Sequence, residues 1–239
     1  MNKETLTVIK IGGNIIDNSE KLHSFLLDFS SLSGKKILVH GGGKAATDMS
    51  ISMDVVPKML EGRRITDIET LRIVTMVYAG LINKNMVAQL QAKKCNAIGL
   101  TGADGNLIKG VKRPVKMVKL ADGTERSVDY GFVGDLDNNS VNPENLEKLL
   151  KAGFVPVFCA ITHDGDTQLL NTNADTVAAA LAVAMSSLYR TSLVYCFEKK
   201  GVMLDVDDED SLIASINNIE FNNLTKEGVI SEGMIPKLQ

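Results

Sequence analysis

The first half of the chain alternates short apolar runs with amphipathic stretches. Leu6 to Ile11 is a run typical of a buried strand, and Ile37 to Val39 is a second one. A further helical pattern begins near Lys44. Between the two strands, apolar residues at helical spacing predict an amphipathic helix that ends near Gly34: Leu22, Phe25, Leu26 and Phe29. A strand, a helix and a strand over so few residues predict a right-handed βαβ unit in a parallel sheet.

The alternation continues toward the end of the chain. Hairpins are predicted within Val55–Thr66 and within 107–132, where Asp122-Gly123 is the clearest turn. Thr66 and Glu69 form a capping box for a long helix with one apolar face, made of Ile68, Leu71, Val74, Tyr78 and Leu81. The remaining strands and helices are expected at Ala97–Leu100, Pro143–Ala152, Val155–Ile161, Thr176–Met185 and Ser192–Phe197. This order predicts an α/β fold.

Glycines follow both of the first two strands. The first strand ends in Lys10, Ile11, Gly12 and Gly13, and the second runs into the triplet at 41–43 before a helix. Glycine lets backbone N–H groups approach a ligand closely, and a helix N-terminus favours an anion. Neither turn has a dinucleotide-binding or P-loop spacing, and for one such turn close helix packing explains the glycines equally well. Two turns at one sheet edge, with a lysine in the first, favour an anion site.

A second group of polar residues follows a later strand. Asn171, Asn173 and Asp175 lie in the run L-L-N-T-N-A-D, immediately before an alanine-rich helix. Either Asn173 or Asp175 alone suffices to cap that helix, so the three side chains offer more polar groups than a cap uses. Arg63 and Arg64 are further candidates. Adjacent arginines are most often solvated, but these lie near the glycine turns, and a carboxylate-clamping role stays open.

Composition excludes several classes of function. The 239 residues are 44% hydrophobic, and 26 basic and 29 acidic residues give a formal charge of -3. The chain lacks a basic stripe with interleaved aromatic residues, the pattern typical of nucleic acid binding. It also lacks an apolar run that resembles a membrane span or a signal sequence. A cytoplasmic protein is therefore expected. Cys95, Cys159 and Cys196 are far apart and, like the histidines, lack metal-ligand spacing, so we expect buried cysteines and no metal site.

Seven short motifs together point to a family. They are I-K-I-G-G, V-H-G-G-G, G-R-R-I-T, G-L-T-G-A-D-G-N, G-F-V-G-D, L-L-N-T-N-A-D and S-E-G-M-I-P-K, in this order along nearly the whole chain. In these motifs the chain resembles the N-acetyl-L-glutamate kinases of the amino-acid kinase superfamily. The resemblance implies a three-layer αβα sandwich around a mostly parallel eight-stranded sheet. It also implies an N-terminal lobe at 1–154 for acylglutamate binding and dimerisation, and a C-terminal lobe at 155–239 for ATP binding.

The resemblance further implies an activity. The expected enzyme transfers the γ-phosphoryl group of ATP, which carries Mg²⁺, to the γ-carboxylate of N-acetyl-L-glutamate in arginine biosynthesis, with N-succinyl-L-glutamate still open as the substrate. A carboxylate is already a nucleophile, so this chemistry needs positioning and charge neutralisation but no general base. Two rivals stay open. One is a sister kinase acting on carbamate, free glutamate or UMP, and the other is a catalytically weak nucleotide or effector sensor.

The matching motifs also imply site residues. The catalytic group would be Lys10, Lys237, Asp175 and Glu198, in which the lysines neutralise the transferring phosphoryl group and the acidic residues hold the site in place. The substrate-binding group would be Gly42, Gly43, Arg64 and Asn171, with Arg64 on the α-carboxylate of the acylglutamate. The nucleotide-binding group would be Gly12, Gly13, Glu198, Lys199, Lys200, Gly201, Val202, Met203, Val229, Ile230 and Ser231.

The chain departs from the family pattern in two places. Glu198 stands where the family has an aspartate, and Phe197 stands where it has a serine. The chain ends at Gln239, where the family continues through another helix and strand, so the C-terminal lobe is expected to be truncated. Only Met1 to Thr5 precede the first strand, too few for the extra helix of the arginine-inhibited hexamers in the family. A homodimer insensitive to arginine is therefore expected.

Overall fold

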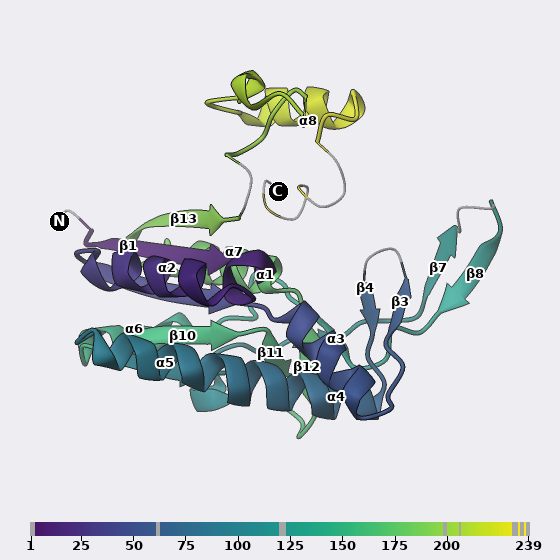
Figure 1. Ribbon diagram of the computed structural model, residues 1–239, viewed down its shortest axis with the longest axis horizontal. Coiled ribbons are helices and arrows are strands. Elements are labelled where there is room, and N and C mark those ends of the chain that lie inside the picture. The colour runs from purple at the N-terminus through teal and green to yellow at the C-terminus, as the bar shows by residue number, and fades with distance from the viewer. Residues whose placement is uncertain are drawn as a thin grey trace.

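The computed structural model describes residues 3–60, 63–119, 123–197, 200–205, 207–230, 234 and 237. Five parallel strands form the central sheet, in the order β13-β1-β2-β10-β5 (Figure 1). They are β1 (Thr5–Ile11), β2 (Lys35–His40), β5 (Ala97–Leu100), β10 (Val155–Cys159) and β13 (Arg190–Cys196). The predicted βαβ unit is confirmed, because β1 and β2 pair in parallel and are joined by α2 (Ser19–Ser31).

A smaller sheet continues from the central one. Its order is β11-β12-β9-β6, formed by β11 (Ile161–His163), β12 (Leu169–Thr172), β9 (Val133–Asp135) and β6 (Val111–Lys112). β11 follows β10 after a single residue, Ala160, whose carbonyl accepts a hydrogen bond from the N–H of Thr172. This interruption divides the apolar run that the sequence predicts as one strand. Among the described strands the two largest sheets therefore have five and four strands, where the resemblance implied one sheet of eight.

Helices cover both faces of the central sheet (Figure 1). On one face lie α2, α3 (Gly43–Ser52) and a long helix made of α4 (Ile68–Thr75), η1 (Met76–Ile82) and α5 (Asn83–Ala92). On the other face lie α6 (Pro143–Lys151) and α7 (Ala174–Met185). The expected three-layer αβα sandwich is confirmed.

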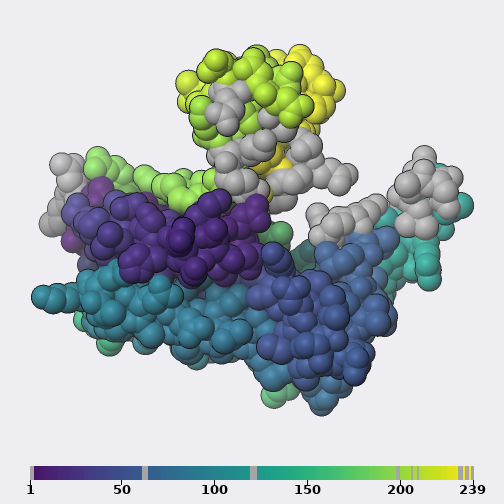
Figure 2. Space-filling view, in the orientation of Figure 1, coloured from purple at the N-terminus to yellow at the C-terminus, as the bar shows by residue number. Residues whose placement is uncertain are grey.

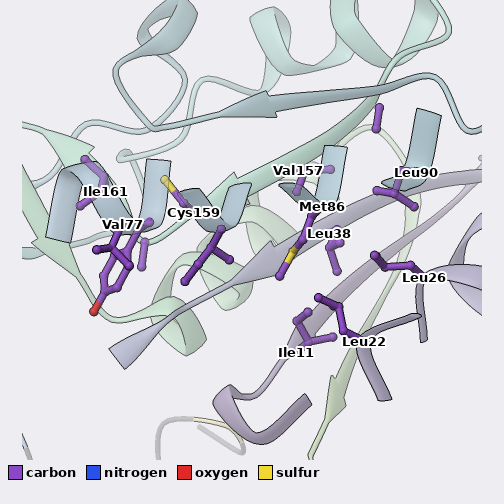
Figure 3. Packing of buried hydrophobic residues seen from close by; sticks show 14 of the residues in the cluster. Ile11, Leu22, Leu26, Leu38, Val77, Met86, Leu90, Val157, Cys159 and Ile161 are labelled. Carbon is purple, nitrogen blue, oxygen red and sulfur yellow. The ribbon is translucent and has the colours of Figure 1, made fainter. Parts of the chain in front are cut away.

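Alternate residues of β1 fill the two cores between these layers. Leu6 and Val8 join the core that contains α6 and α7, whereas Ile9 and Ile11 join the core that contains α2 and the long helix. This division follows from the two-residue period of a strand. Figure 3 shows the second core, in which Ile11 lies beside Leu22 of α2. A strand with both faces buried explains why Leu6 to Ile11 reads as a nearly continuous apolar run.

The long helix contains a π-helical turn that the sequence pattern does not reveal. η1 lies between α4 and α5 and is a π-helix. A π-helical turn holds more residues than an α-helical turn and so rotates the positions that follow it. Leu81, predicted to be buried, is 51% exposed, and Ile82 takes the buried place at 7%. Ile68, also predicted on the apolar face, is exposed as well.

The predicted capping box at Thr66 is wrong. Asp67 caps α4 instead, because its carboxylate accepts a hydrogen bond from the N–H of Thr70 at 2.9 Å. Thr66 is occupied in backbone pairing: its N–H donates to the carbonyl of Tyr130 at 2.9 Å, and its carbonyl accepts from the N–H of Phe132 at 2.7 Å. Thr66 therefore joins the start of the long helix to the segment around 130–132.

Two antiparallel hairpins, both predicted from the sequence, project from one end of the molecule (Figure 1). The first pairs β3 (Lys58–Leu60) with β4 (Arg63–Ile65), and the second pairs β7 (Lys116–Lys119) with β8 (Glu125–Val128). Asp122 of the predicted second turn lies outside the described residues. A small third core joins the two hairpins, formed by Val128, Tyr130, Val133, Leu60, Ile65 and Val118.

The structure confirms the helix expected over Pro143–Ala152 and the burial expected for two of the three cysteines. The side chain of Asn142 accepts a hydrogen bond from the N–H of Asn145 and caps α6, and Gly153 follows that helix with a φ of +83°. Cys95 and Cys159 are buried and free, and Cys196 is free and partly buried.

The C-terminal segment lies beyond β13 and stands apart from the sheet (Figures 1 and 2, green to yellow). It contains η3 (Glu209–Ser211) and α8 (Asn218–Lys226), and two other short helices, α1 (Gly13–Ile16) and η2 (Asp104–Asn106), lie in the body of the protein. α8 buries none of its residues, whereas Met203 and Ile230 are buried. Across the described ranges, no helix is both long and apolar enough to cross a membrane.

Candidate active site

The two glycine turns lie next to each other at the carboxyl edge of the central sheet. β1 and β2 are neighbours, and Ile11 pairs with His40 at their ends. Gly12 then donates its N–H to the carbonyl of Cys196 in β13 at 2.9 Å and precedes α1. Gly42 precedes α3 in the same way. The edge therefore has the geometry in which open α/β sheets bind ligands.

Only glycine fits at position 42. Its φ is +154°, and a Cβ built there would overlap Cδ1 of Ile82 and lie 3.0 Å from Cδ1 of Tyr78. A Cβ at Gly43 would meet no described atom within 4 Å. The turn thus approaches the long helix closely at Gly42 and is open above Gly43, at the N-terminus of α3, where anions are favoured.

Asp175 bridges two lysines that are far apart in the sequence. Nζ of Lys10 lies 2.7 Å from its Oδ1, and Nζ of Lys237 lies 3.3 Å from its Oδ2. The side chains of all three are largely withdrawn from solvent, with 11% of Asp175, 13% of Lys10 and 17% of Lys237 exposed. Oδ1 accepts no well-directed hydrogen bond within the described part of the chain, so its contact with Lys10 is an ion pair of favourable distance and poor angle. One carboxylate thus holds two ammonium groups together at the sheet edge.

Asp175 is available for this pairing because another residue caps the helix. Asn173 accepts hydrogen bonds from the N–H groups of Asp175 and Thr176 and is the N-cap of α7. The hydroxyl of Tyr195, which pairs with Lys10 across the sheet, donates to the backbone carbonyl of Asp175 at 3.3 Å. Burial, followed by the nearby Asp175 charge, raises the pKa of Tyr195 to about 12. Tyr195 therefore stays a neutral hydrogen-bond donor at physiological pH.

Arg64 reaches from the β3–β4 hairpin to the second glycine turn. Its Nη2 donates to the carbonyl of Gly43 at 3.0 Å and to the hydroxyl of Thr47 at 2.7 Å. Its Nη1 is buried and meets no acceptor among the described residues. Burial raises the pKa of the neighbouring Tyr78, and the Arg64 charge opposes that shift. A partly buried guanidinium with an unused donor suits a carboxylate ligand.

Asn171 connects the same hairpin to the second sheet. Its Nδ2 donates to the hydroxyl of Thr66 at 3.0 Å, and its backbone N–H donates to the carbonyl of Phe132. The side chains of Asn171 and Thr66 therefore hold the base of the hairpin that carries Arg64. The three polar residues of this run therefore have separate roles. Asn171 contacts Thr66, Asn173 caps α7, and Asp175 pairs with two lysines.

The remaining predicted residues belong to the C-terminal segment. Glu198, Lys199 and Ser231 lie outside the described residues. Lys200 is exposed, and Gly201 has a φ of +157°. The contacts recorded for the others are local: Met203 bridges to Leu212, Val202 accepts from Ile213, and Val229 and Ile230 donate to Leu224. The contact between Lys237 and Asp175 brings the C-terminal segment to the carboxylate that also pairs with Lys10.

Some residues of this region were not singled out from the sequence. Thr47 contacts Arg64, Tyr78 and Ile82 pack on Gly42, and His40 is fully buried directly before the glycines. Thr47 falls four residues after Gly43, one helical turn into α3, so its position on the hairpin side follows from helix geometry. The contacts of Tyr78 and Ile82 depend on the π turn and were not readable from the sequence.

The charged groups of the site do not resemble a protein metal centre. Within the described ranges, no three His, Cys, Asp or Glu side chains are placed to hold a metal ion. The carboxylate of Asp175 is already paired with two lysines. The site is instead suited to an anion such as a phosphoryl group, which lysines and helix N-termini bind.

Comparison of the chain with known protein families identifies the class of protein to which this fold and site belong. The model of the "Amino acid kinase family" matches residues 5–239. The chain belongs to this family.

Two curated relatives are described as acetylglutamate kinases. The chain is 55% identical over 235 residues to an acetylglutamate kinase of Cytophaga hutchinsonii, covering 98% of this chain and 85% of that protein. It is 53% identical over 237 residues to an acetylglutamate kinase of Phocaeicola vulgatus, covering 99% and 88%. The crystal structure of smu.665 from Streptococcus mutans shares the fold, with a TM-score of 0.75, 24% identity and coverage of 97% and 86%.

Proposed function

We propose that the protein is an acetylglutamate kinase, which transfers the γ-phosphoryl group of ATP to the γ-carboxylate of N-acetyl-L-glutamate in arginine biosynthesis. Identity above 50% over almost the whole chain to proteins of that description carries the proposal. The site geometry supports it, because two lysines meet at one carboxylate beside a pair of glycine turns. N-succinyl-L-glutamate is the alternative acyl substrate.

In the proposed reaction an oxygen of the γ-carboxylate attacks the γ-phosphorus of ATP. A new carboxylate O–P bond forms, the bond from the γ-phosphorus to the β,γ-bridging oxygen breaks, and ADP leaves with the electron pair. No proton has to be removed from the nucleophile, so the protein contributes positioning and charge neutralisation. Lys10 and Lys237 would neutralise the transferring group, and Asp175 would keep their ammonium groups together.

The acylglutamate would lie between the glycine turn and the β3–β4 hairpin. Nη1 of Arg64 has an unused donor for its α-carboxylate, and the backbone N–H groups of Gly42 and Gly43 lie at the N-terminus of α3. Asn171 contacts Thr66 beside that hairpin and would complete the pocket. These residues, apart from Asn171, fall within 1–154, which supports an N-terminal acylglutamate lobe.

The nucleotide would be held by the C-terminal lobe, 155–239, together with the first glycine turn. Gly12 and Gly13 lie at the sheet edge beside Lys10. The other proposed contacts are Glu198, Lys199, Lys200, Gly201, Val202, Met203, Val229, Ile230 and Ser231. We propose that Mg²⁺ arrives bound to the phosphates of ATP, because the one carboxylate of the described site is engaged by lysines. Glu198 would supply a second negative charge near the lysines.

We further propose that the enzyme is a cytoplasmic homodimer that L-arginine does not inhibit. Exposed apolar side chains on two adjoining helices support a second copy as the partner: Ile51 and Met53 at the end of α3, and Ile68, Met76 and Leu81 on the long helix. Light scattering is expected to give a dimer with unchanged activity in millimolar arginine. A hexamer, a monomer or inhibition by arginine would contradict this proposal.

A coupled ADP-release assay tests the proposed activity. N-acetylglutamate, N-succinylglutamate, glutamate and UMP are offered in turn with Mg-ATP. We expect turnover of one of the two acylglutamates and little with glutamate or UMP. Preferred use of glutamate or UMP would indicate a sister kinase, and ATP binding without turnover of any of the four would indicate a sensor.

A further inference from the structure

His40 is a buried polar residue directly beneath the second glycine turn. It ends β2, and its side chain is fully inaccessible to solvent. Its Nδ1 lies 2.8 Å from the carbonyl oxygen of Gly41, and its Nε2 lies 3.0 Å from Nδ2 of Asn83. The imidazole therefore joins the turn to the first residue of α5.

Asn83 is itself held by several partners. Its Nδ2 also donates to the carbonyl of Val157 at 2.9 Å, and its Oδ1 accepts from Nζ of Lys84 at 3.1 Å. Nζ of Lys84 donates as well to the carbonyl of Gly99 at 2.8 Å. Because a carbonyl only accepts and an ammonium group only donates, these partners fix which end of the Asn83 amide faces His40. Nδ2 of Asn83 donates to Nε2 of His40, so the imidazole proton resides on Nδ1.

The surroundings keep this imidazole neutral. Burial lowers the pKa of His40 to about 4, the hydrogen bond to the Gly41 carbonyl opposes this shift, and the Lys84 charge adds to it. At neutral pH the Nδ1–H therefore donates to the carbonyl of Gly41. The direction of that carbonyl is set from inside the core.

The direction of the Gly41 carbonyl also sets the direction of the next N–H. The peptide bond between Gly41 and Gly42 is trans, so its C=O and N–H point in opposite directions. With the carbonyl turned inward to His40, the N–H of Gly42 turns away from the core. No acceptor among the described residues meets that N–H. Two consecutive glycines would otherwise let this peptide rotate easily, because glycine has access to most backbone conformations.

We propose that His40, held by Asn83, is a positioning residue that orients the Gly41–Gly42 peptide so that the N–H of Gly42 donates to the acylglutamate. The inference rests on the proposed function, which makes the acylglutamate the ligand of this turn. The competing explanation is that His40 only fills space. In that case its loss would lower stability without affecting one substrate more than the other.

Two substitutions separate the contributions of the two ring nitrogens of His40. His40→Asn places an amide N–H near the position of Nδ1 and keeps a donor for Gly41. His40→Gln places its amide near the position of Nε2 and keeps a partner for Asn83 only. We expect His40→Gln to lower kcat/KM for N-acetylglutamate about 10-fold or more, because an anionic acceptor loses an oriented donor. KM for ATP should stay within about twofold, and His40→Asn should lose clearly less than His40→Gln.

Met86→Ala is the matched control for loss of core packing. Met86 is fully buried in the same core and lies on α5, and it is no part of the hydrogen-bond network around the turn. It should lower the melting temperature while leaving both KM values near wild type. If His40→Gln and His40→Asn change the kinetics equally, or no more than Met86→Ala does, His40 has a packing role and the inference is overturned.

A crystal structure of His40→Gln without substrate tests the orientation itself. We expect the Gly41 carbonyl to have turned from its wild-type direction. A carbonyl that keeps its direction would overturn the inference even if activity falls. A wild-type protein that turns over no acylglutamate would instead refute the proposed function, and the crystal structure would still decide whether His40 orients the peptide.

Discussion

Asp175→Asn removes one negative charge from the site with almost no change in side-chain shape. The two ammonium groups lie 2.7 and 3.3 Å from its carboxylate oxygens, and 11% of the side chain is exposed. At about 3 Å and an effective dielectric constant of about 20, each pair attracts by ~5 kcal/mol. Desolvation offsets most of this attraction, and hydrogen bonds to charged groups contribute ~1.5 to 3 kcal/mol net.

Without the carboxylate, Lys10 and Lys237 repel each other and no longer converge on the transferring phosphoryl group. A loss of ~1.5 to 3 kcal/mol from the transition state lowers kcat by ~10- to 150-fold. KM for the acylglutamate should change little, because Arg64 and Gly42 are untouched. Asn173 still caps α7, so the fold should persist.

Steady-state ADP release with varied N-acetylglutamate measures this effect. Asp166→Asn is the matched control, since it makes the same chemical change on an exposed loop between β11 and β12. We expect wild-type kcat for Asp166→Asn. A kcat for Asp175→Asn within threefold of wild type would refute the reasoning, because the lysines would then be oriented by something else.

Three further outcomes are expected. Arg64→Ala should raise KM for the acylglutamate far more than KM for ATP, since loss of a charge-assisted contact costs ~2 to 4 kcal/mol. An unchanged KM for the acylglutamate would show that Arg64 does not bind this substrate. Burial lowers the pKa of His40 from 6.5 to about 4 in the folded protein, so only the unfolded chain takes up this proton as pH falls from 6.5 to 4. Urea unfolding should therefore show that ~3 kcal/mol of the free energy of unfolding is lost across that pH range. If His40→Asn loses stability just as steeply with falling pH, this expectation is wrong. Glu198→Gln should lower kcat about 10-fold with nearly unchanged thermal stability, and wild-type turnover would leave the orienting role to Asp175 alone.

The sequence predicted the parts of the fold that depend on local patterns. The apolar run of β1, the helical spacing of α2 and the strand pairs of both hairpins each follow from a short stretch of chain, and the structure confirms them. The exposed positions of Ile68 and Leu81 were not predictable in this way. The exposure of Leu81 depends on the π turn in the long helix. The failed cap at Thr66 depends on the pairing of its backbone with Tyr130 and Phe132, far along the chain.

For the candidate site, too, the sequence predicted the residues that stand out locally but not the contacts between distant segments. The three polar residues around the start of α7 exceed what a cap needs, and the structure gives each a separate partner. The role of His40 was not readable from V-H-G-G-G, because its partner Asn83 comes from a helix 43 positions away. Likewise, no local pattern predicts that Lys237 approaches the same carboxylate as Lys10.

The most direct test of the proposed reaction is to trap its product. Hydroxylamine converts an acyl phosphate into a stable hydroxamate, which mass spectrometry identifies. Incubation of the protein with Mg-ATP, N-acetyl-L-glutamate and hydroxylamine should yield the γ-hydroxamate of N-acetylglutamate in an amount that matches the ADP released. ADP release without any hydroxamate, or no ADP release with either acylglutamate, would contradict transfer to the γ-carboxylate.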